Sequence, residues 1–183
     1  MGKRSDFKRL ERDNYATPAA AVVPLLRRLA PRTPFIEPCV GEGRLVEHLT
    51  AAGHVLVSAH DLPVDARTAR YAVPSDACFI SNPPYFGRPR DLHPLICNLS
   101  SQAAVTWLLL PADWLHNVSS AALMPRLRRV VSVGRVRWIE GTRFTSKDNV
   151  CWMRFSGPAH TPTIFIGRQP RELDEPLLFE AAE

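Results

Sequence analysis

The sequence predicts an α/β protein with a doubly wound, mostly parallel sheet and an antiparallel hairpin near its C-terminal end. Three observations support this prediction. Short apolar runs alternate along the chain with segments of helical period. A pair of glycines follows the first of these runs, as is common where a strand turns into a helix. Two late runs, at 130–139 and 150–155, alternate around a polar loop and indicate an antiparallel pair.

The individual elements follow from the apolar period and from the residues that begin and end them. A first helix is expected at 18–29, with Thr17 as N-cap, Pro18 in the first turn and Pro24 as an interruption. A second helix, at 43–52, should end before Gly53. Further strands are expected at 34–38, 54–60, 78–81, 105–110 and 163–166, and further helices at 63–70, 91–99 and 120–128.

The tetrapeptide Asn82-Pro83-Pro84-Tyr85 follows directly on the apolar run at 78–81. Two prolines fix φ and remove two backbone donors, so this strand end presents two carbonyls and one amide side chain. The Asn82 oxygen and a proline carbonyl can accept the two hydrogens of an NH2 group carried by a planar ring. The Tyr85 ring can cover the face of that planar group. Acceptors outside the ring plane would pull the nitrogen towards a tetrahedral shape and expose its lone pair. The structural alternative is a rigid turn in which Tyr85 only packs.

Gly41 and Gly43 lie between the first expected strand and the helix at 43–52. Glycines let the backbone turn tightly and approach a ligand, and Glu37 lies where the strand ends. The third glycine of the dinucleotide-binding fingerprint is absent after Gly43. Asp61 ends the second expected strand, where doubly wound sheets bind ribose hydroxyls. The alternative for Asp61 is a solvated side chain or a helix N-cap.

With these features in this order, the chain resembles the class I S-adenosylmethionine-dependent methyltransferases that methylate exocyclic amino nitrogens and carry an Asn/Asp-Pro-Pro-aromatic motif. The segment Asn14-Tyr15-Ala16-Thr17-Pro18 is similar to the family segment that closes over the methionine end of the cofactor. The run at 107–111 is similar to the fifth strand of the family. The resemblance covers about residues 12–155 and implies a Rossmann-like fold and S-adenosyl-L-methionine as cofactor.

The resemblance also implies roles for individual residues. The residues implied to bind the cofactor are Tyr15, Thr17, Pro18, Glu37, Gly41, Gly43 and Asp61. Those implied to hold the target amine are Asn82, Pro83, Pro84 and Tyr85. The chain departs from the family in one respect, because no separate target-recognition domain follows the catalytic segments. Target specificity is therefore expected to be loose or to come from a protein partner.

The loop at 141–149 places Phe144 among polar and basic residues, including Arg143 and Lys147. In the enzymes that the chain resembles, a ring from the loop between the last two strands stacks on the extruded base, and Phe144 occupies a similar place. Trp152 is the competing aromatic residue, but it lies in a strand-like run and is predicted to be core. The alternative for Phe144 is that it only anchors its own loop.

Basic residues are concentrated near the hairpin, although the net charge is only +5. Eight basic residues lie between Arg126 and Arg154, against two acids. Residues 1–13 form a basic lead-in and residues 168–183 an acidic tail. Basic segments beside the catalytic edge suit a nucleic-acid backbone, with Arg143 and Lys147 as phosphate contacts. The alternative is a solvated basic face without a ligand.

Length and composition predict one domain over residues 1–183, since 45% hydrophobic residues suffice for one core. The apolar stretches are too short and interrupted for a membrane span, and the first residues lack the apolar core of a signal peptide. Four scattered cysteines favour reduced thiols in a cytoplasmic protein, and no metal site is expected.

Three functions remain open from the sequence. The favoured one is a DNA adenine-N6 methyltransferase. The second is a methyltransferase with another planar target, such as RNA adenine, DNA cytosine N4 or a protein glutamine, since the tetrapeptide would suit each of them. The third is a non-catalytic methyltransferase-like protein that binds nucleic acid. The intact glycines, Asp61 and the complete tetrapeptide argue against the third.

Overall fold

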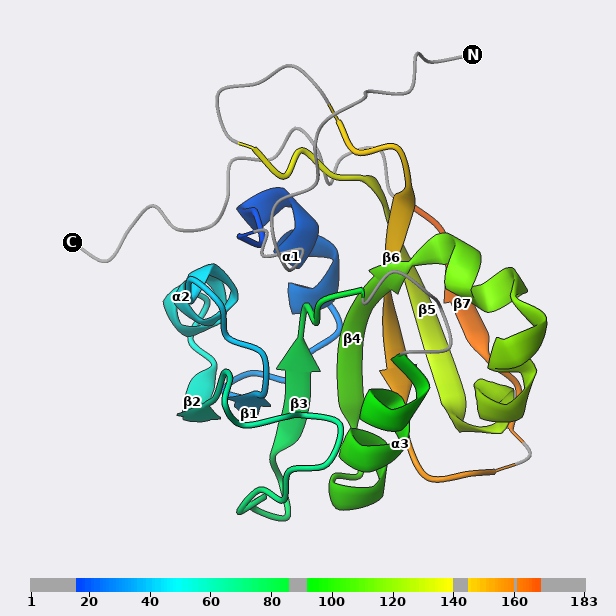
Figure 1. Cartoon of the computed structure of the whole chain (residues 1–183). Helices are drawn as coiled ribbons and strands as arrows, with labels where there is room; N and C mark the ends of the chain where they lie inside the picture. The colour runs from blue at the N-terminus through cyan, green and yellow to red at the C-terminus, as the bar shows by residue number, and fades with distance from the viewer. Residues whose placement is uncertain (1–15, 86–91, 140–144, 160, 169–183) are drawn as a thin grey trace.

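A computed structural model describes residues 16–85, 92–139, 145–159 and 161–168 (Figure 1). One seven-stranded sheet forms its centre, with the strand order β2-β1-β3-β4-β6-β5-β7. The strands are β1 (Pro34–Glu37), β2 (Val55–Ala59), β3 (Cys78–Ser81), β4 (Thr106–Pro111), β5 (Leu127–Arg135), β6 (Asn149–Phe155) and β7 (Ile164–Ile166). Strand β6 is antiparallel to both of its neighbours, and the other pairs are parallel. The predicted mostly parallel sheet with an antiparallel C-terminal part is confirmed.

Helices cover both faces of the sheet (Figure 1). The α-helices are α1 (Ala19–Leu26), α2 (Arg44–Ala51) and α3 (His93–Gln102), and the 3-10 helices are η3 (Ala112–His116) and η4 (Val118–Arg126). Helices α1 and α2 pack on one face, while α3, η3 and η4 pack on the other. The described chain contains no helix long and apolar enough to cross a membrane.

The two cores arise from the alternation of side chains along each buried strand. In β4, Trp107 and Leu109 join the core beneath α1 and α2, whereas Leu108 and Leu110 join the core beneath α3. Successive side chains of a strand point to opposite faces, so a strand covered on both faces needs an unbroken apolar run. Trp152 is fully buried and donates its indole N–H to the Ala21 carbonyl at 2.7 Å, which confirms its predicted place in the core.

The predicted helix at 63–70 is wrong, because the described chain forms turns there. Side-chain amides from α3 take the carbonyls that a helix would use. Asn98 Nδ2 donates to the carbonyls of Ala66 and Ala69 at 3.0 and 2.9 Å, and Gln102 Nε2 donates to Ala69 at 3.1 Å. The turns are thereby fixed on α3, and they connect β2 to β3 without an intervening strand.

Two other helix predictions needed correction. Helix α1 begins at Ala19 with Pro18 as N-cap, continues through the buried Pro24 and ends at Leu26, so Thr17 does not cap it. The helix expected at 120–128 is the 3-10 helix η4, and β5 starts directly after it at Leu127. The predicted strand at 130–139 is therefore shifted towards the N-terminus.

Candidate active site

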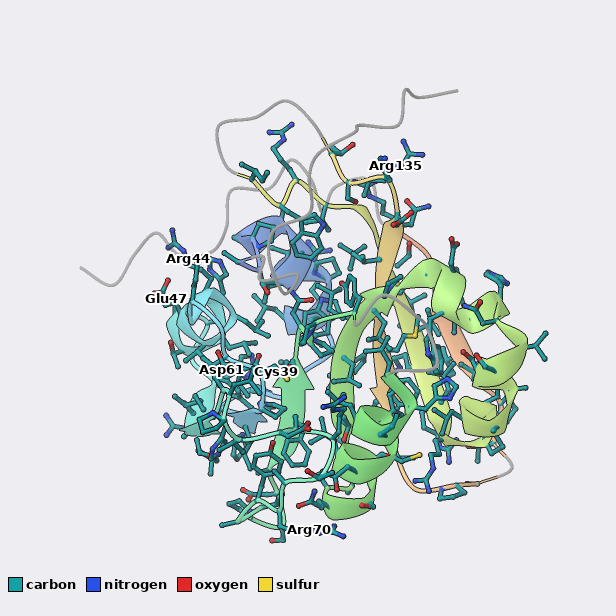
Figure 2. The ribbon with its side chains drawn as sticks, in the orientation of Figure 1. Cys39, Arg44, Glu47, Asp61, Arg70 and Arg135 are labelled. Carbon is teal, nitrogen blue, oxygen red and sulfur yellow. The ribbon has the colours of Figure 1, made fainter. Side chains whose placement is uncertain are left out.

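The glycine turn after β1 lies beside the acid after β2, because the pairing of these strands continues past their ends. His60 N donates to the Glu37 carbonyl and Val40 N to the His60 carbonyl, both at 2.8 Å. One residue further, Gly41 N donates to Asp61 Oδ2 at 3.1 Å. Figure 2 shows Cys39 and Asp61 together at this edge. The carboxyl ends of two neighbouring strands thus join the predicted glycine and acid in one site.

Both glycines of the turn have backbone angles that favour glycine. Gly41 has φ +50° and Gly43 has φ +81°, both in the left-handed region. Gly43 is also the N-cap of α2, whose first residue is Arg44. The turn therefore brings backbone N–H groups and the helix start to the carboxyl edge of the sheet.

Glu37 is a buried acid at the end of β1, with 1% of its surface exposed. Its Oε1 accepts the Cys39 N–H at 2.9 Å. Burial raises the pKa of Glu37 to about 8, since it disfavours the charged form. The Cys39 N–H and the nearby Ser81 hydroxyl favour the carboxylate and offset part of this rise, although no aligned hydrogen bond joins Ser81 to Glu37. At neutral pH Glu37 is mainly a neutral acid.

The Asn82 amide is held on both sides. Its Nδ2 donates to Thr17 Oγ1 at 3.0 Å, across 65 residues of sequence. Its Oδ1 accepts the Tyr85 hydroxyl at 3.3 Å. Thr17 thus orients the amide group, and the oxygen proposed to accept a target amine already has a partner within the tetrapeptide.

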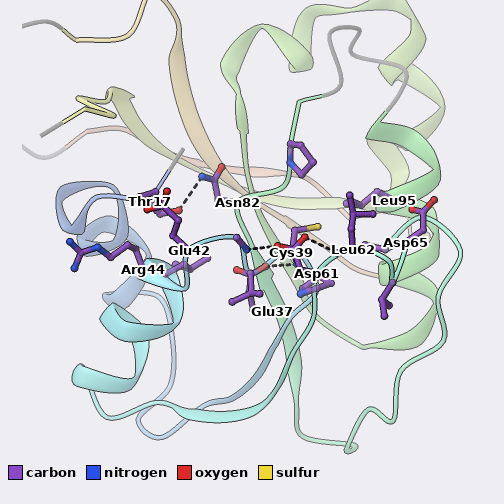
Figure 3. Close-up of a pocket in the computed structure, with 18 of the residues that line it drawn as sticks. Thr17, Glu37, Cys39, Glu42, Arg44, Asp61, Leu62, Asp65, Asn82 and Leu95 are labelled. Atoms are coloured by element: carbon purple, nitrogen blue, oxygen red, sulfur yellow. Dashed lines mark hydrogen bonds between the residues drawn. The ribbon is translucent and has the colours of Figure 1, made fainter. Parts of the chain in front are cut away.

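A cavity of about 390 Å³ connects these groups (Figure 3). The predicted site residues that line it are Thr17, Glu37, Gly41, Asp61, Asn82 and Pro84. Those that lie outside its lining are Pro18, Gly43, Pro83, Tyr85 and Lys147. Tyr15, Arg143 and Phe144 lie outside the described residues. The structure therefore brings residues of all three sequence motifs to one cavity.

Sequence reasoning missed the wall formed by Leu62, Val64 and Ala66. Val64 and Ala66 belong to the segment 63–70 that was interpreted as a helix, and Leu62 directly precedes it. The signal in the sequence was their position just after Asp61. The wall ends in an ion pair between Arg67 and Asp65 at 2.7 Å. Leu95 of α3 also lines the cavity. This part of the cavity offers apolar surface next to the carboxyl group of Asp61.

The cavity is lined by more acids than bases. Three carboxyl side chains besides the neutral Glu37 line it together with Arg44 and Arg67, namely Glu42, Asp61 and Asp65. Both arginines have acidic partners, Arg44 with Glu47 at 3.2 Å and Arg67 with Asp65. The balance suits a ligand with a positive charge, because opposite charges attract more strongly where water is partly excluded.

The basic residues around the hairpin do not form one surface. Arg154 of β6 pairs with Trp107, near the start of β4, and also with Arg129 of β5. The start of β5 and the end of β6 therefore lie at the amino edge of the parallel strands. Arg135, paired with Asn149, lies at the opposite, carboxyl edge. Arg126, Arg128, Arg129 and Arg154 are therefore separated from the cavity by the length of the strands.

The four cysteines are free thiols, as expected. Cys78 and Cys151 are buried, and burial raises the pKa of Cys78 to about 12. Cys39 is half-buried, packs against the core beneath α3 and also lines the cavity. Within the described ranges, no group of three or more His, Cys, Asp or Glu side chains could hold a metal ion.

No family model and no curated protein sequence matches the chain, but solved structures do. PH1948 of Pyrococcus horikoshii, a candidate RNA methyltransferase, has a TM-score of 0.56 and 15% identity, over 84% of this chain and 93% of that one. The methyltransferase subunit of a type I restriction-modification system from Streptococcus thermophilus has a TM-score of 0.53 and 10% identity, over 84% and 47%. The type IIG restriction endonuclease BpuSI has a TM-score of 0.54 and 12% identity, over 79% and 26%. The chain therefore has a Rossmann-like methyltransferase fold. It spans about half the length of the type I methyltransferase subunit and about a quarter of the length of BpuSI.

Proposed function

We propose that the chain is an S-adenosylmethionine-dependent methyltransferase acting on an exocyclic amino nitrogen of a nucleic acid, with adenine N6 in DNA as the target. The observation that carries this proposal is the single cavity in which Glu37, Gly41 and Asp61 meet Asn82 and Pro84. A glycine turn and a second-strand acid are the parts of a nucleoside site, and the tetrapeptide is suited to an amine.

The cavity fits this cofactor in charge and in chemistry. A sulfonium and an ammonium group are attracted by its acidic lining, to which Asp61 and Glu42 contribute. Asp61 is placed to accept ribose hydroxyls, and the apolar wall at Leu62 and Val64 suits a purine ring. When bound, the cofactor supplies an electrophilic methyl group.

The tetrapeptide positions the amine and polarises it. Asn82 Oδ1 and the Pro83 carbonyl accept the two amine hydrogens, and the Tyr85 ring covers the face of the base. Thr17 holds the amide so that its oxygen, rather than its NH2, is offered to the target. After attack the nitrogen is acidic and loses its proton to water, so no dedicated base is required. The protein contributes positioning and electrostatics.

RNA adenine is the second candidate target. PH1948 is matched over 93% of its length, whereas the two restriction-modification proteins are matched only in part. A partner protein is the proposed source of the target specificity, for DNA as for RNA. Arg143, Phe144 and Lys147 remain the proposed contacts to the phosphate backbone and the flipped base.

The test is transfer of labelled methyl groups to unmethylated DNA, RNA and protein in parallel, with the modified nucleoside or residue identified by mass. N6-methyladenine in DNA is the expected product, and label confined to RNA or protein would replace the proposed target. Asn82→Ala should keep its cofactor affinity and lose about 100- to 1000-fold in rate, because it removes an acceptor needed in the transition state.

Asn117→Ala is the matched control, since this asparagine caps the carbonyl of Asp113 between η3 and η4. Its rate should equal that of the wild type. An Asn82→Ala protein as fast as wild type would show that the tetrapeptide is not the catalytic edge. A wild type whose melting temperature does not respond to millimolar S-adenosylmethionine would refute the enzyme assignment.

A further inference from the structure

A second cavity, of about 420 Å³, lies at the amino edge of the sheet, opposite the candidate active site. Cys78 at the start of β3 and Val105 directly before β4 lie in its wall. Its basic lining residues are Arg28, Arg129 and Arg154, and we call it the arginine cavity. The six residues of β4 separate the two cavities by roughly 20 Å, at about 3.3 Å per residue.

Two of these arginines are cross-strand neighbours, which is electrostatically unfavourable for the folded protein. Arg129 of β5 and Arg154 of β6 are paired directly across the antiparallel ladder. Like charges in such a pair repel and destabilise a sheet. Burial and the charges of Arg129 and Arg128 lower the pKa of Arg154. Arg28 follows helix α1, where a cation is favourable for the helix, so its position has a structural explanation as well.

Two donors in the arginine cavity have no partner in the described part of the protein. Arg28 Nε and Arg129 Nε are buried and have no hydrogen-bond partner in the part of the chain that the structure describes. Within the same ranges, no carboxylate forms an ion pair with any of the three arginines. Asp76 lies in the lining and is exposed, and no ion pair joins it to them. By contrast, Arg128 donates to the carbonyls of Pro125, Leu127 and Gly157 and is satisfied.

We propose that the arginine cavity binds a phosphate group, held by the guanidinium groups of Arg28, Arg129 and Arg154. Planar guanidinium groups donate paired hydrogen bonds to phosphate oxygens, and a bound anion would satisfy the buried donors and screen the repulsion between the two strands. The phosphate comes either from a nucleic-acid backbone that continues past the active site or from a free phosphorylated compound. The proposal does not depend on methyl transfer.

Binding is tested with the full chain by calorimetry, using inorganic phosphate, pyrophosphate and a single-stranded oligonucleotide as probes. Arg129→Gln and Arg154→Gln should each weaken phosphate and pyrophosphate binding about tenfold or more, as expected for charge-assisted hydrogen bonds. Arg70→Gln is the charge-matched control, because Arg70 is exposed and lies outside the cavity lining (Figure 2). Its binding should equal that of the wild type.

The probes separate the two sources of the phosphate. If the two variants weaken oligonucleotide binding as well, and the slope of affinity against salt falls by about one, the ligand is a backbone phosphate. If they weaken only phosphate and pyrophosphate binding, the ligand is a free phosphorylated compound. Either result supports the phosphate site. Absence of binding at millimolar phosphate, or an equal loss in Arg70→Gln, overturns the proposal.

Stability in the absence of phosphate distinguishes a binding role from a structural one. Arg154→Gln should raise the melting temperature, since it removes a like charge that the fold itself does not use. Asp76→Asn should tighten phosphate binding a few-fold by removing a negative charge from the rim. If instead both substitutions lower the melting temperature by several degrees, the arginines and Asp76 stabilise the fold and the proposal fails.

Discussion

The carboxyl and amino edges of the same sheet have opposite chemical character. At the carboxyl edge, Glu42, Asp61 and Asp65 line a cavity whose two arginines are paired with acids. At the amino edge, Arg129 and Arg154 lie in a cavity without an ion-pair partner among the residues that the structure describes. One edge thus suits a cationic ligand and the other an anionic one.

The difference shows how strand direction distributes charge. The eight basic residues from Arg126 to Arg154 are close in sequence, and they suggest one basic face. Because β6 runs antiparallel to β5, the first and last of them meet at the amino edge, while Arg135 and Lys147 lie towards the carboxyl edge. Basic residues that are close together in the sequence thus lie at two opposite edges of the sheet, and each group can be tested independently.

The strongest test of this separation is Gly41→Val. A β-branched residue at φ +50° is strained, so the turn should shift and its N–H should leave Asp61. We expect affinity for S-adenosylmethionine to fall about 100-fold, measured by calorimetry, with unchanged phosphate binding at the amino edge.

Gly53→Val provides the control for backbone strain. Gly53 also has a left-handed φ, of +85°, and a Cβ there would meet no atom within 4 Å. Its affinity for the cofactor should stay that of the wild type. Equal losses in both variants would mean that Gly41 acts only through the stability of the fold.

A smaller effect is expected for Thr17→Val, which removes the acceptor for Asn82 Nδ2. The amide then loses its fixed orientation, and the rate of methyl transfer should fall about tenfold, in line with one hydrogen bond. Thr17→Ser should restore most of the rate. A change in KM for the cofactor with an unchanged kcat would instead assign Thr17 to cofactor binding, as the family resemblance implies.

The last effect concerns Glu37 and appears in the melting temperature rather than in the rate. The folded protein binds a proton at Glu37 up to a pH of about 8, whereas the unfolded chain releases it near 4.5. Stability should therefore fall as the pH rises from 4.5 to 8, because the unfolded state binds fewer protons in this range. Melting curves should show a decline on the order of 10 °C for the wild type.

Glu37→Gln should flatten that decline, since glutamine is neutral at every pH and has a similar shape. Glu42→Gln, at an exposed position of the same cavity, should leave the decline unchanged. Parallel melting curves for wild type and Glu37→Gln would show that Glu37 is ionised in the folded protein at neutral pH.

The parts of the site that could be predicted are those encoded by local backbone chemistry. Glycines with left-handed φ, a proline pair after an apolar run and an acid after a strand each constrain their own few residues. Their convergence on one cavity follows from parallel strands, whose carboxyl ends meet at one edge. This explains why the sequence could predict that Gly41, Asp61 and Asn82 lie near one another.

The parts that could not be predicted depend on partners distant in sequence. The turns at 63–70 have a helix-like sequence, but Asn98 and Gln102 of α3 take their carbonyls. Thr17 has the sequence position of an N-cap, but its hydroxyl faces Asn82. In each case a tertiary hydrogen bond replaced the local one that the pattern indicated.

The hydrogen bond from the Tyr85 hydroxyl to Asn82 Oδ1 has a consequence for selectivity under the proposed reaction. A base with an amino group can donate to Asn82 Oδ1 in place of the Tyr85 hydroxyl, so the acceptor keeps one hydrogen bond when the base enters. A base that carries an oxygen at the same position offers no donor and would leave the acceptor without a partner. Discrimination against such bases would then begin before any methyl group moves, within the four residues that hold the target.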